Sequence, residues 1–107
     1  MQLKQYQIIL VNLDPTIGSE IKKTRPCVIV SPDEMNRHLH LITVCPITST
    51  SKKYPTRIKI LMDRKVSWIV VDQIRTTDKI RVIEITGQLG ADTISILKAT
   101  IKETFVD

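Results

Sequence analysis

Residues 15–36 read PTIGSEIKKTRPCVIVSPDEMN, and this stretch decides how the chain folds and where its chemistry lies. A glycine turn at Gly18 is followed by three Lys or Arg residues and then by an apolar run that begins at Pro26. Glycine admits positive φ, and proline fixes φ at the start of an extended segment, so this pattern predicts an exposed turn that leads into a strand. A second turn at residues 32–36 ends that strand.

Apolar and β-branched runs recur along the rest of the chain, with turn-forming residues between most of them. Residues 8–11 are continuously apolar and are expected to be covered on both faces. Residues 57–60 alternate and are expected to have one wet face. Short strands at this spacing indicate a small barrel, and the predicted strands cover residues 8–13, 27–30, 39–45, 57–61, 68–71 and 80–85.

After Gly90 the apolar residues change to a helical spacing of three and four. A candidate N-cap stands at Asp92, and the apolar positions behind it are Ile94, Leu97, Ile101 and Phe105. This pattern predicts one amphipathic C-terminal helix that closes the barrel. Trp68 heads an apolar run and is expected to belong to the core.

Composition is that of one soluble globular domain spanning residues 1–107, with 42% apolar and 25% charged residues. The net charge of +5 is uneven, because residues 22–81 hold thirteen Lys or Arg and five Asp or Glu, a balance of +8. Such a field attracts nucleic acid, an anionic membrane surface or an acidic protein, although a solvated lysine-rich surface is the alternative on charge alone. An aromatic content of 4% argues against a recognition sheet built on stacked aromatic rings.

Two Cys and two His residues raise the question of metal or redox chemistry. Cys27 and Cys45 lie in apolar runs without CxxC spacing, which indicates buried structural thiols in a reducing cytoplasm. His38 and His40 would share one face of a strand, but nothing completes a zinc ligand set, so we expect no metal and no cofactor. No signal-peptide pattern opens the chain and no apolar run approaches the roughly 18 residues that span a bilayer. We therefore expect a cytoplasmic protein with no membrane partner.

The chain resembles the MazF/PemK/Kid family, the growth-inhibiting toxins of type II toxin–antitoxin pairs. The resemblance rests on residues 18–20, the Arg25-Pro26 pair, the turn at 32–36, and two later blocks at 46–49 and 72–79, all in the family's order and spacing. It implies a mainly β fold with a C-terminal helix: a small, twisted antiparallel barrel of the SH3-like or CcdB-like type.

This chain departs from the family pattern at three places. Lys4-Gln5-Tyr6 stands where an Arg-Gly-acidic triplet is usual, which weakens the entry turn. Ser19 and Val70 occupy positions where some members carry histidine and arginine, so the roles of those side chains cannot be carried over. The chain is similar to the branch of the family that relies on arginine and threonine.

Arg25 is the main candidate for catalysis if the substrate is single-stranded RNA. The 2′-hydroxyl of RNA can attack the neighbouring phosphorus without a metal if negative charge is stabilised and protons are moved. The planar, permanently charged guanidinium of Arg25 suits phosphate oxygens but is a poor general base. Glu20, a substrate phosphate oxygen or a perturbed arginine remain candidates for that base. Outside the surrounding pattern, Arg25 would be interpreted as a surface ion-pair residue.

The resemblance implies a catalytic role for Thr48, which opens a loop rich in hydroxyl groups and lysine. Outside that resemblance the loop would be a solvated turn, and the Gly18 segment an ordinary one. Side chains at the Gly18 lip, in the loop and at the end of the Trp68 strand are candidates for binding phosphates or bases. These RNA-binding candidates are Gly18, Ser19, Ser49, Lys52, Lys53, Asp72 and Gln73.

The resemblance implies a sequence-specific, metal-independent endoribonuclease that leaves 2′,3′-cyclic phosphate and 5′-hydroxyl ends. It also implies a homodimer and an acidic, partly disordered cognate antitoxin whose carboxylates occupy phosphate positions. Two alternatives stay open: a non-catalytic toxin of the same fold that binds DNA gyrase, and an inactive RNA-binding relic. The combination of Glu20, Arg25 and Thr48 favours the nuclease, because a gyrase binder has no chemical need for it.

Overall fold

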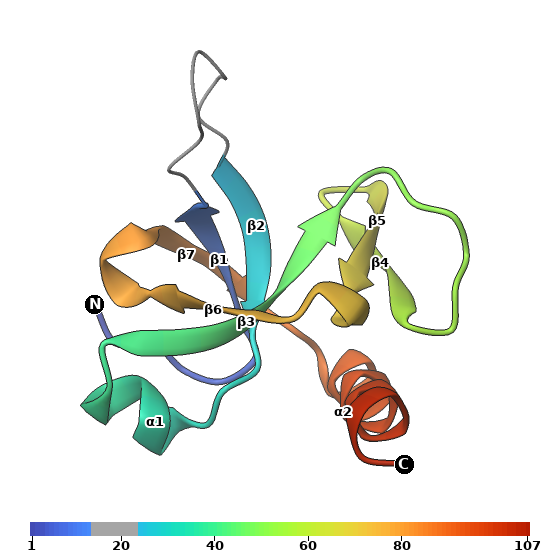
Figure 1. The fold of residues 1–107 in the computed structure, drawn as a ribbon. Coiled ribbons are helices and arrows are strands. Elements are labelled where there is room, and N and C mark those ends of the chain that lie inside the picture. The colour runs from blue at the N-terminus through green and yellow to red at the C-terminus, as the bar shows by residue number, and fades with distance from the viewer. Residues whose placement is uncertain (14–23) are drawn as a thin grey trace, which may run out of the picture.

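The computed structural model describes residues 1–13 and 24–107. In that part of the chain, seven strands form one sheet and two α-helices and two short 3-10 turns connect or flank them (Figure 1). In chain order the elements are β1 (Gln7–Asn12), β2 (Thr24–Ile29), α1 (Asp33–His38), β3 (Leu41–Thr48), β4 (Arg57–Met62), β5 (Lys65–Val70), η1 (Val71–Gln73), β6 (Arg75–Asp78), η2 (Lys79–Arg81), β7 (Val82–Gln88) and α2 (Ala91–Phe105).

The strands follow the order β4-β5-β3-β2-β1-β7, and β6 pairs with β3 off this path. Every pairing is antiparallel. The sheet curls strongly, so that the β4–β5 hairpin stands away from β1, β2 and β7 while α2 lies near the hairpin (Figure 1). The prediction of a mainly β, twisted antiparallel barrel with a C-terminal helix is confirmed as a curled half-barrel.

Strand β3 changes partners along its length. Residues Leu41–Val44 pair with β6, and Ile47 and Thr48 pair with β5. Pro46 lies between these two ladders, while Val44, Cys45 and Pro46 pair with β2 across the other edge. Proline has no backbone N–H to donate, so it is tolerated where a ladder is interrupted. This change of partner carries β3 from one half of the curled sheet to the other.

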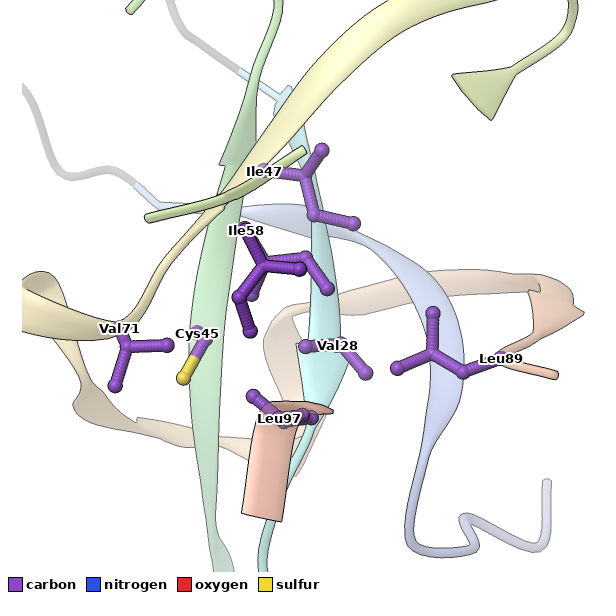
Figure 2. Packing of buried hydrophobic residues seen from close by; sticks show 8 residues of the cluster. Val28, Cys45, Ile47, Ile58, Val71, Leu89 and Leu97 are labelled. Carbon is purple, nitrogen blue, oxygen red and sulfur yellow. The ribbon is translucent and has the colours of Figure 1, made fainter. Parts of the chain in front are cut away.

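Two apolar clusters cover opposite faces of β2 and β3, because neighbouring residues of these strands alternate between them. The larger cluster lies between the sheet and α2 and consists of Val28, Cys45, Ile47, Ile58, Ile69, Val71, Leu89 and Leu97 (Figure 2). The second cluster consists of Leu3, Ile9, Val11, Cys27, Ile29, Ile42 and Val44.

Burial along the strands matches two of the expectations. In β1, Ile9 and Val11 are buried in the second cluster while Ile8 packs against the first, so both faces are covered. In β4, Ile58 is buried and Lys59 is exposed, which gives the expected wet face. Both cysteines are buried and free, and burial raises the pKa of each thiol to about 12. Both thiols therefore stay protonated, as expected for structural cysteines.

Helix α2 begins earlier than its pattern predicted. Its N-cap is Gly90, and Asp92 lies inside the first turn, where a carboxylate interacts favourably with the helix dipole. Leu97 is fully buried and Ile94 and Ile101 pack against the larger cluster, as expected for an amphipathic helix, whereas Phe105 at the end of the stripe is 52% exposed. Phe105 is the last residue of α2, two turns beyond Leu97.

Five further features of the structure differ from what the sequence predicted. The turn at 32–36 is the start of α1, and β6 was not predicted because its sequence RTTD is polar. The strand predicted from residue 80 begins at Val82, since η2 precedes it and the Asp78 carboxylate accepts a hydrogen bond from the Ile80 N–H at 3.0 Å. Trp68 is only partly buried and belongs to neither cluster. His38 is the last residue of α1, so it does not share a strand with His40.

Leu97 is the fully buried side chain that α2 contributes to the larger cluster, and Ile94 and Ile101 of the same helix also pack against that cluster (Figure 2). We predict that Leu97→Ala lowers the free energy of unfolding by about 2–5 kcal/mol, because it removes a fully buried side chain and leaves a cavity. Urea unfolding followed by circular dichroism measures this. The matched control is Ile96→Ala, whose side chain is 52% exposed and whose loss should cost much less. Equal losses for the two variants would contradict the packing described for α2.

Candidate active site

The register between β2 and β3 brings Arg25 and Thr48 together. Cys27 pairs with Pro46, and extending this antiparallel register by two residues places Arg25 opposite Thr48. Residues opposite each other across antiparallel strands project from the same face of the sheet. Arg25 and Thr48 accordingly line the same two adjoining clefts.

These two clefts have volumes of about 430 and 540 Å³, and they share Arg25, Thr48 and Thr50. We call them together the active cleft. The smaller is lined by Leu13, Arg25, Pro46, Thr48, Thr50, Arg57, Val70, Gln73 and Arg75, and the larger by Thr24, Arg25, Pro26, Ile47, Thr48, Ser49, Thr50 and Ser67. No Asp or Glu of the described residues is among them.

The hydroxyl of Thr48 is held by a local turn. Its Oγ1 accepts a hydrogen bond from the Thr50 N–H at 3.2 Å and lies 3.2 Å from the Thr50 carbonyl oxygen, to which it can donate. This is the hydroxyl turn expected of such a loop. The turn fixes the hydroxyl at the end of β3 while leaving it in the cleft.

The active cleft is strongly positive. Arg25 and Arg75 both line its smaller part. Burial is the main cause that raises the pKa of the Cys27 thiol, and the charges of these two arginines act in the opposite direction. Within residues 1–13 and 24–107, neither arginine forms an ion pair with a carboxylate. Their charges are therefore available to an anion that enters the cleft.

Arg57, in contrast, is committed to a carboxylate. Its Nε and Nη2 donate to the two carboxylate oxygens of Asp72 at 3.2 and 3.3 Å, and its Nη1 donates to Ser51 Oγ at 2.9 Å. Thr56 donates to Asp72 as well, at 2.8 Å. The hydrogen bond from Arg57 is the main cause that lowers the pKa of Asp72, and the same bond raises the pKa of Arg57. This bidentate pair ties the start of β4 and the loop before it to η1.

Of the other predicted site residues, some line the active cleft and others lie outside it. Ser49 and Gln73 line the active cleft, whereas the carboxylate of Asp72 is held by Arg57 and lies outside it. Lys53 lines a separate groove beside Trp68, and Lys52 is exposed in the loop. Gly18, Ser19 and Glu20 lie outside the described residues. The structure places none of them.

Five polar or charged cleft residues were not predicted from the sequence as site residues: Thr24, Thr50, Arg57, Ser67 and Arg75. Arg75 stands inside the block 72–79 that carries the resemblance, so the signal for it was present. Ser67 is buried on β5, the strand that pairs with β3 at its last residues, Ile47 and Thr48. Arg57 carried no signal, because its role depends on Asp72, fifteen residues later in the chain.

The arrangement can bind a phosphodiester and stabilise added negative charge on it. Guanidinium groups and a hydroxyl donor surround a polar hollow, and these are the donors that a developing phosphorane requires. Among residues 1–13 and 24–107, no three His, Cys, Asp or Glu side chains gather as metal ligands. In the same part of the chain, neither helix has the length and apolar character required to cross a bilayer.

We predict that Arg57→Gln raises the pKa of Asp72, because the variant removes the hydrogen bond and the charge that now lower it. In the wild-type protein, this pair stabilises the folded state at pH values above the ordinary pKa of aspartate. The contribution is lost as the pH falls through the lowered pKa of Asp72. Carboxyl-carbon NMR titration measures the change, with Lys102→Gln as a remote control. An Asp72 titration that is identical in wild type and Arg57→Gln would contradict the pairing.

Comparisons with known proteins place the chain in a family. A family model described as "PemK-like, MazF-like toxin of type II toxin-antitoxin system" matches residues 4–105. The chain is 31% identical to "Endoribonuclease MazF9" of Mycobacterium tuberculosis over 112 residues, which cover 94% of this chain and 93% of the relative. It is 34% identical to "Endoribonuclease MazF" of Staphylococcus saprophyticus over 88 residues, which cover 77% and 73%.

Solved structures show the same fold. MazF of Deinococcus radiodurans, in its MazE–MazF complex, superimposes with a TM-score of 0.83 at 24% identity, covering 97% of this chain and 96% of that one. The Mycobacterium tuberculosis toxin MazF-mt6 superimposes with a TM-score of 0.78 at 24% identity, covering 92% and 95%. The family model that spans residues 4–105 and the two relatives that are 31% and 34% identical show that the chain belongs to the PemK-like, MazF-like toxins of type II toxin–antitoxin systems.

Proposed function

We propose that the protein is a sequence-specific endoribonuclease toxin that cleaves single-stranded RNA without a metal or other cofactor. The observation that carries the proposal is that Arg25 and Thr48 line one cleft, which holds three arginines and no carboxylate of the described residues. The names of the curated relatives support it, since two family members that match most of this chain are endoribonucleases.

The reaction needs two proton movements and one displacement at phosphorus. The 2′-oxygen loses its proton and bonds to phosphorus, the bond from phosphorus to the 5′-oxygen breaks, and that oxygen takes up a proton. The products are a 2′,3′-cyclic phosphate and a 5′-hydroxyl. Arg25 stabilises the charge that develops on the non-bridging oxygens, and the Thr48 hydroxyl donates a hydrogen bond to one of them.

The general base is a separate question from charge stabilisation. Arg57 cannot serve, because its pairing raises its pKa, and Asp72 is a poor proton acceptor because the same pairing lowers its pKa. Three candidates remain: Glu20, a phosphate oxygen of the substrate and an arginine of the cleft. Ser49 and Gln73 hydrogen-bond the bases or sugars beside the scissile phosphate. Gly18 and Ser19, which lie outside the described residues, are further candidates for this role.

A toxin of this kind needs an inhibitor in the cell. We propose that the protein forms a homodimer and that an acidic antitoxin segment fills the active cleft, with carboxylates in the positions of RNA phosphates. Complexes support this proposal: the Deinococcus radiodurans relative is crystallised with MazE, and a mycobacterial endoribonuclease of the same fold is solved with its cognate antitoxin. The cationic lining of the cleft fits such a segment.

We predict that Arg25→Ala lowers the cleavage rate by about 10²–10³, the cost of removing one donor to a developing oxyanion. Cleavage of a fluorescent single-stranded RNA measures it. Lys98→Ala, an exposed cation of α2 outside the cleft, is the control for a change in net charge and should cleave like wild type. Equal rates for Arg25→Ala and wild type would remove Arg25 from catalysis, and a folded wild type that never cleaves would favour the gyrase-binding or inactive alternative.

Thr48 is tested by separating its hydroxyl from its shape. We predict that Thr48→Val cleaves about 10²-fold more slowly, because the donor to phosphate is lost, and that Thr48→Ser keeps most of the rate. Thr86→Val, on β7 and outside the cleft, controls for the loss of a threonine hydroxyl. If Thr48→Val and Thr48→Ser have the same rate, the hydroxyl plays no part in the reaction.

A further inference from the structure

A second groove of about 380 Å³ is lined by residues of the β4–β5 hairpin, of α2 and of the loop before β4, and it shares Arg57 with the active cleft. We call it the aromatic groove, because it contains two of the four aromatic residues of the chain. Its lining is Lys53, Tyr54, Pro55, Arg57, Ile58, Lys59, Trp68, Ile96 and Thr100. We propose that this groove binds bases of the same RNA strand, in the part that extends beyond the active cleft. The proposal rests on the proposed ribonuclease function.

The aromatic groove adjoins the active cleft at Arg57. Arg57 lines both, and Lys53 and Tyr54 belong to the loop that begins at Thr48. Trp68 stands opposite Thr48 in the β3–β5 register. A strand of RNA whose scissile phosphate lies at Thr48 therefore has the groove one β-strand away.

The charge of the groove fits a polyanion. Lys53, Arg57 and Lys59 line it, and no Asp or Glu of the described residues does. Lys59 is exposed on β4, opposite Trp68 in the β4–β5 register. A cation thus flanks each aromatic ring, which is the arrangement that tracks the backbone of a single strand while its bases stack.

Tyr54 is held ready for stacking. Tyr54 is 46% exposed, and the Arg57 guanidinium carbon lies 4.9 Å from the centroid of its ring. Asp72 and Ser51 in turn fix Arg57. An aromatic ring that is ordered before binding loses little conformational entropy when a base stacks on it. The Arg57–Asp72 pair thereby gains a use that is not catalytic.

The apolar side of the groove is formed by side chains that include Trp68 and Ile96, neither of which belongs to a core cluster. Trp68 belongs to neither core cluster although it heads an apolar run, and Ile96 of α2 is 52% exposed beside it. Apolar surface next to cations suits a nucleobase, which has an apolar face and a nearby phosphate. An acidic peptide would use the cations but would leave both aromatic faces without a stacking partner.

The only tryptophan of the chain reports on this groove directly. Once the cleaved sequence is known, 2′-fluoro oligonucleotides, which lack the attacking hydroxyl, are titrated into the wild-type protein while Trp68 fluorescence is followed. One oligonucleotide carries the cleaved sequence alone, and two others extend it in the 5′ or the 3′ direction. We expect one of the extended oligonucleotides to quench Trp68 and to bind about tenfold or more tightly than the short one, the gain expected from one stacked base.

Variants assign this gain to particular side chains. Tyr54→Leu should abolish the advantage of the extended oligonucleotide over the short one, and Tyr54→Phe, which keeps the ring, should restore it. Lys53→Gln with Lys59→Gln should flatten the salt dependence of binding the extended oligonucleotide by roughly 1.4 in log–log slope, because two phosphate contacts are lost. Lys98→Gln with Lys102→Gln removes the same charge from α2 outside the groove and should leave that slope unchanged.

Two results would overturn the inference. One is an extended oligonucleotide that binds no better than the short one and leaves Trp68 fluorescence unchanged. The other is quenching of Trp68 by an acidic antitoxin peptide and not by any oligonucleotide, which would make the groove a protein site. Cleavage of the short RNA by wild type is measured in parallel, so that failure of the groove is distinguished from failure of the ribonuclease function.

Discussion

The change of partner along β3 is the constraint on which the rest of the structure depends. Each end of β3 needs a hydrogen-bonded neighbour on the same edge, and no single strand supplies both, so β6 pairs with the first half and β5 with the second. Pro46 stands where the two ladders meet. The curled sheet follows, with one apolar cluster on each face of β2 and β3.

The same constraint places the active cleft. Strand β3 ends at Thr48, two residues beyond Pro46, the last residue that pairs with β2. Extending the β2–β3 register by two residues places Arg25 opposite Thr48. The cleft therefore opens where a ladder stops and the strands separate. Three arginines line it, and of these only Arg57 has a carboxylate partner among the described residues. A cleft with this charge favours an anionic ligand such as a phosphate group.

Most of this fold was predictable from the sequence, because the spacing of apolar residues shows which faces of a strand are buried. Residues 8–11 are continuously apolar and residues 57–60 alternate. Prediction failed at the polar strand β6, whose order comes from the edge of β3 and not from its own residues. Trp68 was misassigned to the core because it heads an apolar run, although its neighbours Ser67 and Ile69 are the buried ones and alternation turns Trp68 the other way. Arg25 and Thr48 were predictable from local pattern and family resemblance, whereas the Arg57–Asp72 pair joins segments that only the folded chain brings together.

The central claim is that this cleft cuts RNA by attack of the 2′-hydroxyl without a metal. The most direct measurement incubates the purified protein with mixed-sequence single-stranded RNA in excess EDTA, then sequences the fragments and assays their end groups. We expect cuts at one short recurring sequence, each leaving a 2′,3′-cyclic phosphate and a 5′-hydroxyl. Cleavage that EDTA abolishes, or fragments with 5′-phosphate and 3′-hydroxyl ends, would contradict it.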